Sequence, residues 1–275
     1  MQLTRRRALK SLAVAAAGLA AGSGAYGFVY ERVRLTVARA TLRLPALPPA
    51  LDGLRIGLLT DIHHSLFMPQ EDVARAAGLL RAARPDLIVL GGDYVTWNDR
   101  RYVVPCAEAL APLAAEVPHG VFAVLGNHDD DRYVPAALER VGFTVLRDQR
   151  TRTVINGEAL ELAGIRFWTR RARDIAAVTR GANGPVLLLA HDPRRLVEAA
   201  SLDIPLVLSG HTHGGQVVLP VIGAVAATRY PVVAGPGTRG RTTIFVSRGL
   251  GTVFVPVRLN CPPEVAVLTL RRGSA

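Results

Sequence analysis

Cysteine is scarce in this chain: its 275 residues include only Cys106 and Cys261. Two cysteines are too few for the disulfide framework that holds small secreted domains together. The sequence leaves open whether the two pair, as they could in an exported protein, or remain buried free thiols. A chain of this length that is 49% hydrophobic can instead bury a sizeable core, which fits one large α/β domain.

Lysine is almost absent, since Lys10 is the only one, and the formal net charge of +11 therefore comes nearly all from arginine. A basic surface suits an anionic partner such as a phosphate ester or a membrane face, although it can also be an ordinary solvated surface. Aromatic residues make up only 5% of the chain, and no arginine run is interleaved with them as in surfaces that bind nucleic acid. We therefore expect no nucleic-acid partner, and the charge alone leaves the other anionic partners open.

Charge of either sign is missing from Ser11 to Tyr30, a run of twenty residues that follows a basic segment at 5–10. Arg5-Arg6 ahead of this apolar run is typical of a twin-arginine export signal, and residues 23–25 offer a small-residue cleavage site. The run is also about long enough to span a bilayer, and the apolar residues beyond the cleavage site favour an uncleaved anchor. Residues 1–30 are therefore predicted to be a twin-arginine-type signal or a membrane anchor. Either way we expect the protein to be exported by the twin-arginine route, with its body periplasmic, otherwise extracytoplasmic, or anchored to the outer face of the cytoplasmic membrane.

Apolar runs alternate with segments of helical spacing in the rest of the chain. Residues 31–53 are predicted to be a linker with one edge strand at 33–44, and residues 54–272 a single catalytic domain. The alternation implies βαβ units, with antiparallel strands at 243–246 and 265–270 closing the domain. We predict an α/β fold of two packed mixed β-sheets flanked by helices, an α/β/β/α sandwich. The expected helices span 71–84, 102–116, 135–141 and 193–200, and the other strands span 54–60, 87–90, 121–125, 143–146, 151–155, 159–162, 165–168, 186–189 and 206–208.

Five apolar, strand-like runs each end on side chains that bind metals. The segments that follow them contain five of the seven histidines of the chain. In an open α/β sheet, ligands bind where parallel strands end, so five such ends at one edge would build a polynuclear metal site. The segments are Thr60-Asp61-Ile62-His63, Gly91-Gly92-Asp93, Gly126-Asn127-His128-Asp129, Ala190-His191-Asp192 and Ser209-Gly210-His211-Thr212-His213.

The types of side chain indicate which ions such a site would take. Carboxylate, imidazole and amide groups without a thiolate favour Mn, Fe or Zn over Cu(I) or an iron–sulfur cluster. Asp93 follows a tight Gly-Gly turn and lies between the other segments in sequence, so we predict that it bridges two divalent metal ions, about 3.5–4 Å apart in such sites. Any one of these histidines alone could be an ordinary core residue, but five in this order predict a metal site.

The five segments in this order resemble those of the calcineurin-like metallophosphoesterases, over about residues 53–270. Segments 209–216, 246–251 and 262–264 further resemble the exported phosphodiesterase branch of that family, which includes the YaeI- and YkuE-type proteins and is related to UDP-2,3-diacylglucosamine hydrolases. The resemblance implies two metal ions that share Asp93. It assigns the first ion to Asp61, His63, Asp93 and His213, and the second to Asp93, Asn127, His191 and His211.

In the mechanism that we predict with this resemblance, a metal-bridging hydroxide attacks the phosphorus in line. His128 protonates the leaving oxygen and Asp129 orients that imidazole, so these two are the predicted catalytic residues. The predicted activity is dinuclear-metal phosphoester hydrolysis, as a phosphodiesterase or pyrophosphatase. A non-catalytic metal-binding surface or scaffold protein of the same fold is the alternative.

The predicted location and one loop favour a lipid-linked or cell-envelope phosphoester as the substrate of a membrane-associated monomer. Leu66–Pro69, together with Tyr94 and Trp97, lies at the expected mouth of the site and predicts an apolar lip for such a substrate. A loop held against the core by Phe67 is the competing interpretation.

Overall fold

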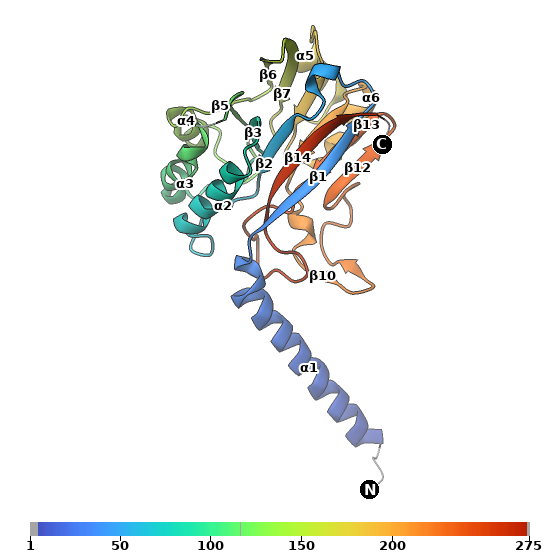
Figure 1. The fold of residues 1–275 in the computed structure, drawn as a ribbon. Helices are drawn as coiled ribbons and strands as arrows, with labels where there is room; N and C mark the ends of the chain where they lie inside the picture. Colours follow the sequence, from blue (N-terminus) through green and yellow to red (C-terminus); the bar gives the residue numbers. More distant parts are fainter. Residues whose placement is uncertain (1–4, 116, 274–275) are drawn as a thin grey trace.

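Two six-stranded β-sheets pack face to face in the computed structural model, which describes residues 5–115 and 117–273 (Figure 1). In spatial order the first sheet contains β1 (Thr36–Leu44), β14 (Glu264–Arg272), β2 (Arg55–Leu59), β3 (Leu87–Leu90), β4 (Val121–Ala123) and β5 (Thr144–Val145). The second contains β12 (Gly235–Arg239), β13 (Thr242–Val246), β9 (Leu206–Ser209), β8 (Val186–Leu189), β7 (Glu158–Gly164) and β6 (Gln149–Ile155). A short hairpin of β10 (Val218–Leu219) and β11 (Gly223–Ala224) lies outside both sheets.

Helices cover the outer faces of the two sheets. The first sheet is covered by α2 (Gln70–Ala82), α3 (Val103–Leu110) and α4 (Tyr133–Arg140), and the second by α5 (Ala172–Thr179) and α6 (Leu196–Ser201). In α2 the buried residues Val73, Ala76, Ala77 and Leu80 recur at the helical period, which turns one apolar face toward the sheet. Short 3₁₀ helices are η1 (Glu31–Val33), η2 (Pro49–Leu51), η3 (Arg100–Tyr102), η4 (Ala111–Leu113), η5 (Pro193–Arg195) and η6 (His213–Gly215).

The main hydrophobic core lies between the two sheets. Leu58 and Val89 from the first sheet pack in one buried cluster with Leu189 and Leu208 from the second. Each such side chain contributes about 1.5–3 kcal/mol when it is fully removed from water. Separate apolar clusters join each sheet to its own helices, so the layers run helix, sheet, sheet, helix. This order confirms the predicted α/β/β/α sandwich.

Both cysteines lie in packed regions of the body. Cys106 and Cys261 are buried and unpaired, so the structure has free thiols where the sequence left pairing open. Burial raises the pKa of the Cys106 thiol, which keeps it protonated and unreactive.

The directions of the closing strands are partly as predicted. β14 is antiparallel to β2, as expected, with Ala266 opposite Leu58, but it runs parallel to β1 on its other side. β13 was also expected to be antiparallel, which is correct for its pairing with β12 and wrong for its pairing with β9, to which it runs parallel. The sequence did not predict β12, because its residues Gly-Pro-Gly-Thr-Arg have neither an apolar alternation nor strand propensity.

The predicted strand at 165–168 is wrong. β7 ends at Gly164, and the chain then turns at Phe167 and Trp168. The turn places the Phe167 ring beside the imidazoles of His191 and His211, with ring centroids 5.9 and 5.2 Å apart. A local apolar pattern cannot show this contact, because it depends on residues far along the chain.

Most predicted helices are present with altered ends. The segments at 71–84 and 135–141 correspond to α2 and α4, and the segment at 193–200 begins as η5 and continues as α6. The segment at 102–116 is shorter, with α3 followed by η4, and residue 116 itself lies outside the described residues. We did not predict α5, an eight-residue helix in which Ile175 is the buried residue.

The N-terminal helix α1 (Arg5–Val29) projects away from the body (Figure 1). By length and composition Leu9–Val33 could cross a membrane, and only 6% of its apolar window is buried. This helix could be a signal or an anchor, and residues 1–4 of the predicted leader lie outside the described part of the chain. Within the predicted linker, β1 is the expected edge strand and pairs with β14 from Thr36 to Leu44, so this part belongs to the sheet.

Substituting Leu58→Ala should lower the free energy of unfolding by about 2–5 kcal/mol, because the cavity opens between two sheets that cannot close over it. Urea denaturation followed by circular dichroism measures the change. Val154→Ala, at a 58% exposed position on β6, is the control and should cost far less. Equal losses in both variants would contradict the assignment of the core.

Candidate metal centre

The residues predicted to bind metal lie together at one edge of the two sheets. Three of their loops follow β2, β3 and β4 in the first sheet, and two follow β8 and β9 in the second. Parallel strands end at this edge, so the packing of the sheets brings five distant loops to one place. The side chains that meet there are Asp61, His63, Asp93, Asn127, His191, His211 and His213.

Five of these seven residues have a left-handed backbone, which non-glycine residues rarely adopt. Such a conformation costs of order 1–3 kcal/mol per residue and persists only where the surroundings enforce it. Residues with such a strained backbone are common at functional sites, where the unusual conformation turns their side chains toward the site. The φ angles are 50° for Asp61, 48° for His63, 57° for Asp93, 72° for His211 and 52° for His213.

The first ligand group contains Asp61, His63 and His213, whose ligand atoms all lie within 4.8 Å of one another. The Nε2 atoms of the two histidines are 3.1 Å apart. Their outer nitrogens are already engaged: Nδ1 of His213 donates to the Gly251 carbonyl at 3.2 Å, and Nδ1 of His63 lies 3.1 Å from the Thr96 hydroxyl. These contacts leave both Nε2 lone pairs facing the same space, as in histidine ligands of metals.

The second group contains Asp93, His191 and His211, with ligand atoms again within 4.8 Å of one another. Nε2 of His191 is 3.1 Å from Oδ2 of Asp93 and 3.2 Å from Nδ1 of His211. Nδ1 of His191 donates to the Gly91 carbonyl at 2.8 Å, and Nε2 of His211 hydrogen-bonds the Tyr230 hydroxyl at 2.7 Å. The remaining nitrogens therefore face the group, as in the first one.

Asp93 lies between the two groups. Its Oδ2 atom is 3.1 Å from Nε2 of His191 and 3.6 Å from Nε2 of His63. Its other oxygen accepts a hydrogen bond from the backbone amide of His128 at 2.9 Å, which fixes the orientation of the carboxylate. One oxygen that faces both ligand groups is the geometry required of a carboxylate that bridges two ions.

Asn127 provides an independent indication of a cation. Its Oδ1 atom is buried and has no hydrogen-bond partner among the residues that the structure describes. A buried acceptor left in this state costs about 1–3 kcal/mol, so native structures seldom tolerate one. The same oxygen is the only ligand atom that asparagine offers to a hard cation. The residues present therefore fit a metal centre of nitrogen and oxygen ligands.

Burial and neighbouring charge set the ionisation of the ligands. Burial lowers the pKa of His63 and of His213 to about 3, so both imidazoles are neutral and offer a lone pair. Burial also opposes the charged form of His191, but the Asp93 carboxylate outweighs it and raises the pKa of His191 to about 10. Burial likewise opposes ionisation of Asp93, but His191 holds the pKa of that carboxyl well below its usual range. A cation that binds here therefore takes the place of a proton.

Glycine is required where the backbone passes against the ligands. A Cβ atom at Gly126 would lie 2.0 Å from Oδ1 of Asp93, and one at Gly210 would lie 2.2 Å from Oδ2 of Asp61. Any other residue would therefore displace a ligand carboxylate. These two contacts explain the glycines that precede Asn127 and His211.

His128 lies beside the ligand groups, as predicted. Its ring contacts those of Trp97 and His63, with centroids 4.4 and 5.0 Å away. Its Nδ1 atom accepts a hydrogen bond from the Trp97 backbone amide at 3.1 Å, so the ring carries its proton on Nε2. The imidazole can therefore donate from Nε2 in its neutral form. Its role as general acid stays a prediction.

The predicted role of Asp129 is wrong. Its carboxylate does not orient His128, whose Nδ1 is engaged by Trp97. Instead it accepts hydrogen bonds from the backbone amides of Gly126, Asp93 and Tyr94 at 2.8, 2.7 and 2.8 Å. Asp129 thus ties the loop after β4 to the loop after β3 and positions Asp93.

Several supporting residues could not be found from the sequence. The fully buried Arg258 donates to the carbonyls of Gly251 and Arg248 at 2.6 and 2.8 Å, and the first of these carbonyls also accepts the proton of His213. Arg248 pairs with Glu264 at 2.5 Å. Both arginines therefore have structural contacts here. Segment 246–251 was noted for its resemblance to the phosphodiesterase branch, but its sequence does not show these contacts.

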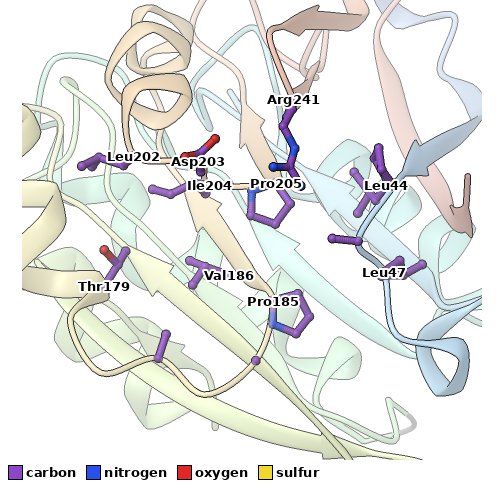
Figure 2. A pocket seen from close by; sticks show the side chains of 14 residues that line it. Leu44, Leu47, Thr179, Pro185, Val186, Leu202, Asp203, Ile204, Pro205 and Arg241 are labelled. Carbon is purple, nitrogen blue, oxygen red and sulfur yellow. The ribbon is translucent and has the colours of Figure 1, made fainter. Parts of the chain in front are cut away.

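A cavity of about 660 Å³ adjoins the ligand groups, and its lining includes Asn127, His128, Tyr230, Trp97 and Phe254. A second cavity, of about 500 Å³, lies at the opposite end of the second sheet, where β8 and β9 begin (Figure 2). Leu44, Leu47, Pro185 and Pro205 surround it, and neither of the two ligand groups borders it. The chemistry therefore belongs to the first cavity.

A family model described as calcineurin-like phosphoesterase matches residues 54–215, more than half of the chain, and the chain belongs to this family. The protein is accordingly a phosphoester hydrolase of the metallophosphoesterase class. It is 33% identical to the phosphodiesterase YaeI of Escherichia coli (strain K12), over 98% of this chain and 99% of that protein. It is 31% identical to the uncharacterised metallophosphoesterase YkuE of Bacillus subtilis (strain 168), over 98% of both chains. A transmembrane protein with a metallophosphoesterase domain from Danio rerio is 29% identical over 90% of this chain and 60% of its own length.

Substituting Asp93→Asn should remove both metal ions, because a neutral amide cannot bridge two cations. Asparagine tolerates the same left-handed backbone, so the fold should remain. Asp203→Asn is the matched control, since Asp203 has a similar φ of 52° but is exposed at the far end of the second sheet. Elemental analysis of protein purified in Mn²⁺ measures the ions per chain. Full occupancy in the Asp93 variant would contradict the bridging role.

Proposed function

We propose that this protein is a dinuclear-metal phosphodiesterase that hydrolyses lipid or cell-envelope phosphoesters outside the cytoplasm. The observation that supports it most directly is the position of Asp93, with one oxygen 3.1 Å from Nε2 of His191 and 3.6 Å from Nε2 of His63. Asp61, His63 and His213 would complete the first ion site, and Asn127, His191 and His211 the second. Ligands of nitrogen and oxygen without thiolate favour Mn, Fe or Zn.

When bound, the two ions would supply a nucleophilic hydroxide and neutralise charge on the phosphoryl oxygens. The side chains around them position the ester. His128 offers its Nε2 proton to the leaving oxygen, in a neutral tautomer that the Trp97 amide fixes. Asp129 holds the two loops that carry Asp93 and Asn127, so that the ligands keep their places as charge moves.

A diester fits the cavity better than a small monoester. A diester carries a second organic group, and the apolar wall of Trp97, Phe254 and Val255 gives that group a surface to contact. The name of the relative YaeI, a phosphodiesterase, supports the same class of substrate. An open cavity beside His128 also supports turnover over a scaffold role, because a scaffold needs no access to its metals.

The N-terminal segment supports export followed by attachment to the membrane. Arg5-Arg6 fits the twin-arginine route, and α1 is long enough to span a bilayer. Cations before the apolar run favour a cytoplasmic N-terminus, which places the body on the outer face. The description of the Danio rerio relative as a transmembrane protein agrees with attachment.

Hydrolysis of bis(p-nitrophenyl) phosphate in Mn²⁺ tests the activity. Wild-type protein should release nitrophenolate, and Asp93→Asn should be inactive. An inert wild type with two bound ions per chain would overturn the proposal and favour a metal-binding scaffold.

Substituting His128→Ala should leave both ions in place and lower kcat by about 10²–10⁴, the usual size of a lost proton donor. His119→Ala, a partly exposed histidine away from the ligand groups, should keep wild-type kcat. Steady-state kinetics and metal analysis on the same samples separate the two effects. Loss of metal from the His128 variant would show that this residue is a ligand and not a donor.

A further inference from the structure

Large apolar side chains are exposed around the mouth of the metal-site cavity. They come from four separate loops, those after β2 and β3, the β10–β11 turn and the segment before β14. Each is more than half exposed, and together they form what we call the mouth patch: Leu66, Trp97, Val221, Ile222, Phe254 and Val255. Single exposed apolar residues are ordinary, but a contiguous group of this kind marks a surface that binds a partner.

Contacts show that these loops form one surface. The rings of Trp97 and Phe254 are 5.7 Å apart, and both line the cavity with Val255. The β10–β11 hairpin is held to the segment before β14, since Val218 donates to the Leu259 carbonyl at 2.8 Å. This hairpin and α1 lie at the same end of the body (Figure 1).

The end of α1 is attached to the same loops. Phe28 packs against Phe67, with ring centroids 6.4 Å apart, and Arg32 donates to the Phe67 carbonyl. The Gly27 carbonyl accepts a hydrogen bond from the Arg258 amide at 3.3 Å. Glu31 is buried and accepts one from the Cys261 amide at 2.6 Å. The apolar helix therefore leaves the body beside the mouth patch.

The length of the helix places this junction at the membrane surface. The uncharged run from Ser11 to Tyr30 has twenty residues, and at 1.5 Å per residue it spans about 30 Å, the thickness of the hydrocarbon core. A bilayer therefore needs the whole run, and its last turn lies at the outer interface. Tyr26 and Tyr30, with rings 5.3 Å apart, fit the aromatic belt at that level. The loops that contact Gly27 and Phe28 must then lie at the interface too.

We propose that the mouth patch docks into the outer leaflet of the membrane that α1 spans, so that the metal-site cavity opens directly onto lipid headgroups. The substrate is then an acylated phosphodiester taken from that same bilayer, with its acyl chains along Trp97 and Phe254. This inference rests on the proposed phosphodiesterase function and adds the place from which the substrate comes. Arg229, exposed at the cavity rim, supplies a cation for anionic headgroups.

Tryptophan fluorescence tests the docking without any activity. The chain has two tryptophans of similar exposure, Trp97 at 63% and Trp168 at 68%. The Trp168 ring packs edge-on against Phe167 and lies under the Arg170 guanidinium, beside a separate polar cavity and outside the mouth patch. The full-length variants Trp168→Phe and Trp97→Phe each keep one tryptophan and are reconstituted in phosphatidylglycerol–phosphatidylcholine bilayers with brominated acyl chains.

Trp97 should lose most of its emission to brominated lipid, and Trp168 should keep its emission and be quenched by iodide from the water. Equal quenching of both by brominated lipid, or of neither, would overturn the proposal. The second of these results, with Trp97 protected from iodide, would instead indicate that a second copy of this chain covers the patch.

Activity gives the second test. Val221→Ser with Ile222→Ser changes the hairpin tip, outside the cavity lining, and Val154→Ser with Val197→Ser is the matched control on β6 and α6. The tip variant should turn over a fluorescent phosphodiester lipid in bilayers about tenfold more slowly, since interfacial binding scales with inserted apolar area. Turnover of bis(p-nitrophenyl) phosphate should not change in either variant.

The two assays separate the possible failures. Wild-type protein that hydrolyses neither ester would overturn the proposed function, while the fluorescence result still decides the docking. Hydrolysis of the soluble ester with equal lipid turnover in tip and control variants would overturn the docking alone.

Discussion

A single buried carboxylate, Asp93, connects the two halves of the metal centre, and the rest of the site is built to keep it there. Its Oδ2 atom faces a histidine from each ligand group, and its Oδ1 atom is held by the backbone amide of His128. Gly126 leaves it room, and Asp129 fixes its backbone amide. A buried negative charge is costly unless it is paired, so this arrangement needs cations or protons around it.

The two sheets make that concentration of charge possible. Leu58 and Leu208 pack in the same core between them, a few residues before the loops that carry Asp61 and His211. A close-packed core deforms little, so the strands hold the ends of these loops in fixed positions. The residues with left-handed backbone in the loops can therefore be held in place. The favourable free energy of core burial therefore offsets the cost of the strained backbone and the buried charges at the sheet edge. The site thus depends on the packing of the fold.

The position of α1 relative to the site follows from the same arrangement. The loops that complete the first ligand group also reach α1: the Gly251 carbonyl binds His213 and Arg258, and the Arg258 amide binds Gly27. Access to the cavity and the exit of the apolar helix therefore lie on the same end of the body. Of the lip predicted from the sequence, Leu66, Phe67 and Trp97 are exposed, whereas Met68 and Tyr94 are buried in the core. Phe254, Val221 and Ile222, which that prediction lacked, are also exposed.

The sequence alone determined the class of fold, and it predicted which side chains meet at the sheet edge, because both depend on local patterns. The chain alternates apolar runs of strand length, which end on Asp, Asn or His, with segments of helical spacing. In such a fold the ends of the strands can meet in few ways other than at one edge of a sheet. The roles of Asp129, Arg258 and Phe167, the parallel pairing of β13 and the strand β12 were decided only by the tertiary structure. Each depends on which backbone groups come near from distant segments, and a side chain that accepts three amides or donates to several carbonyls carries no local signature of that environment.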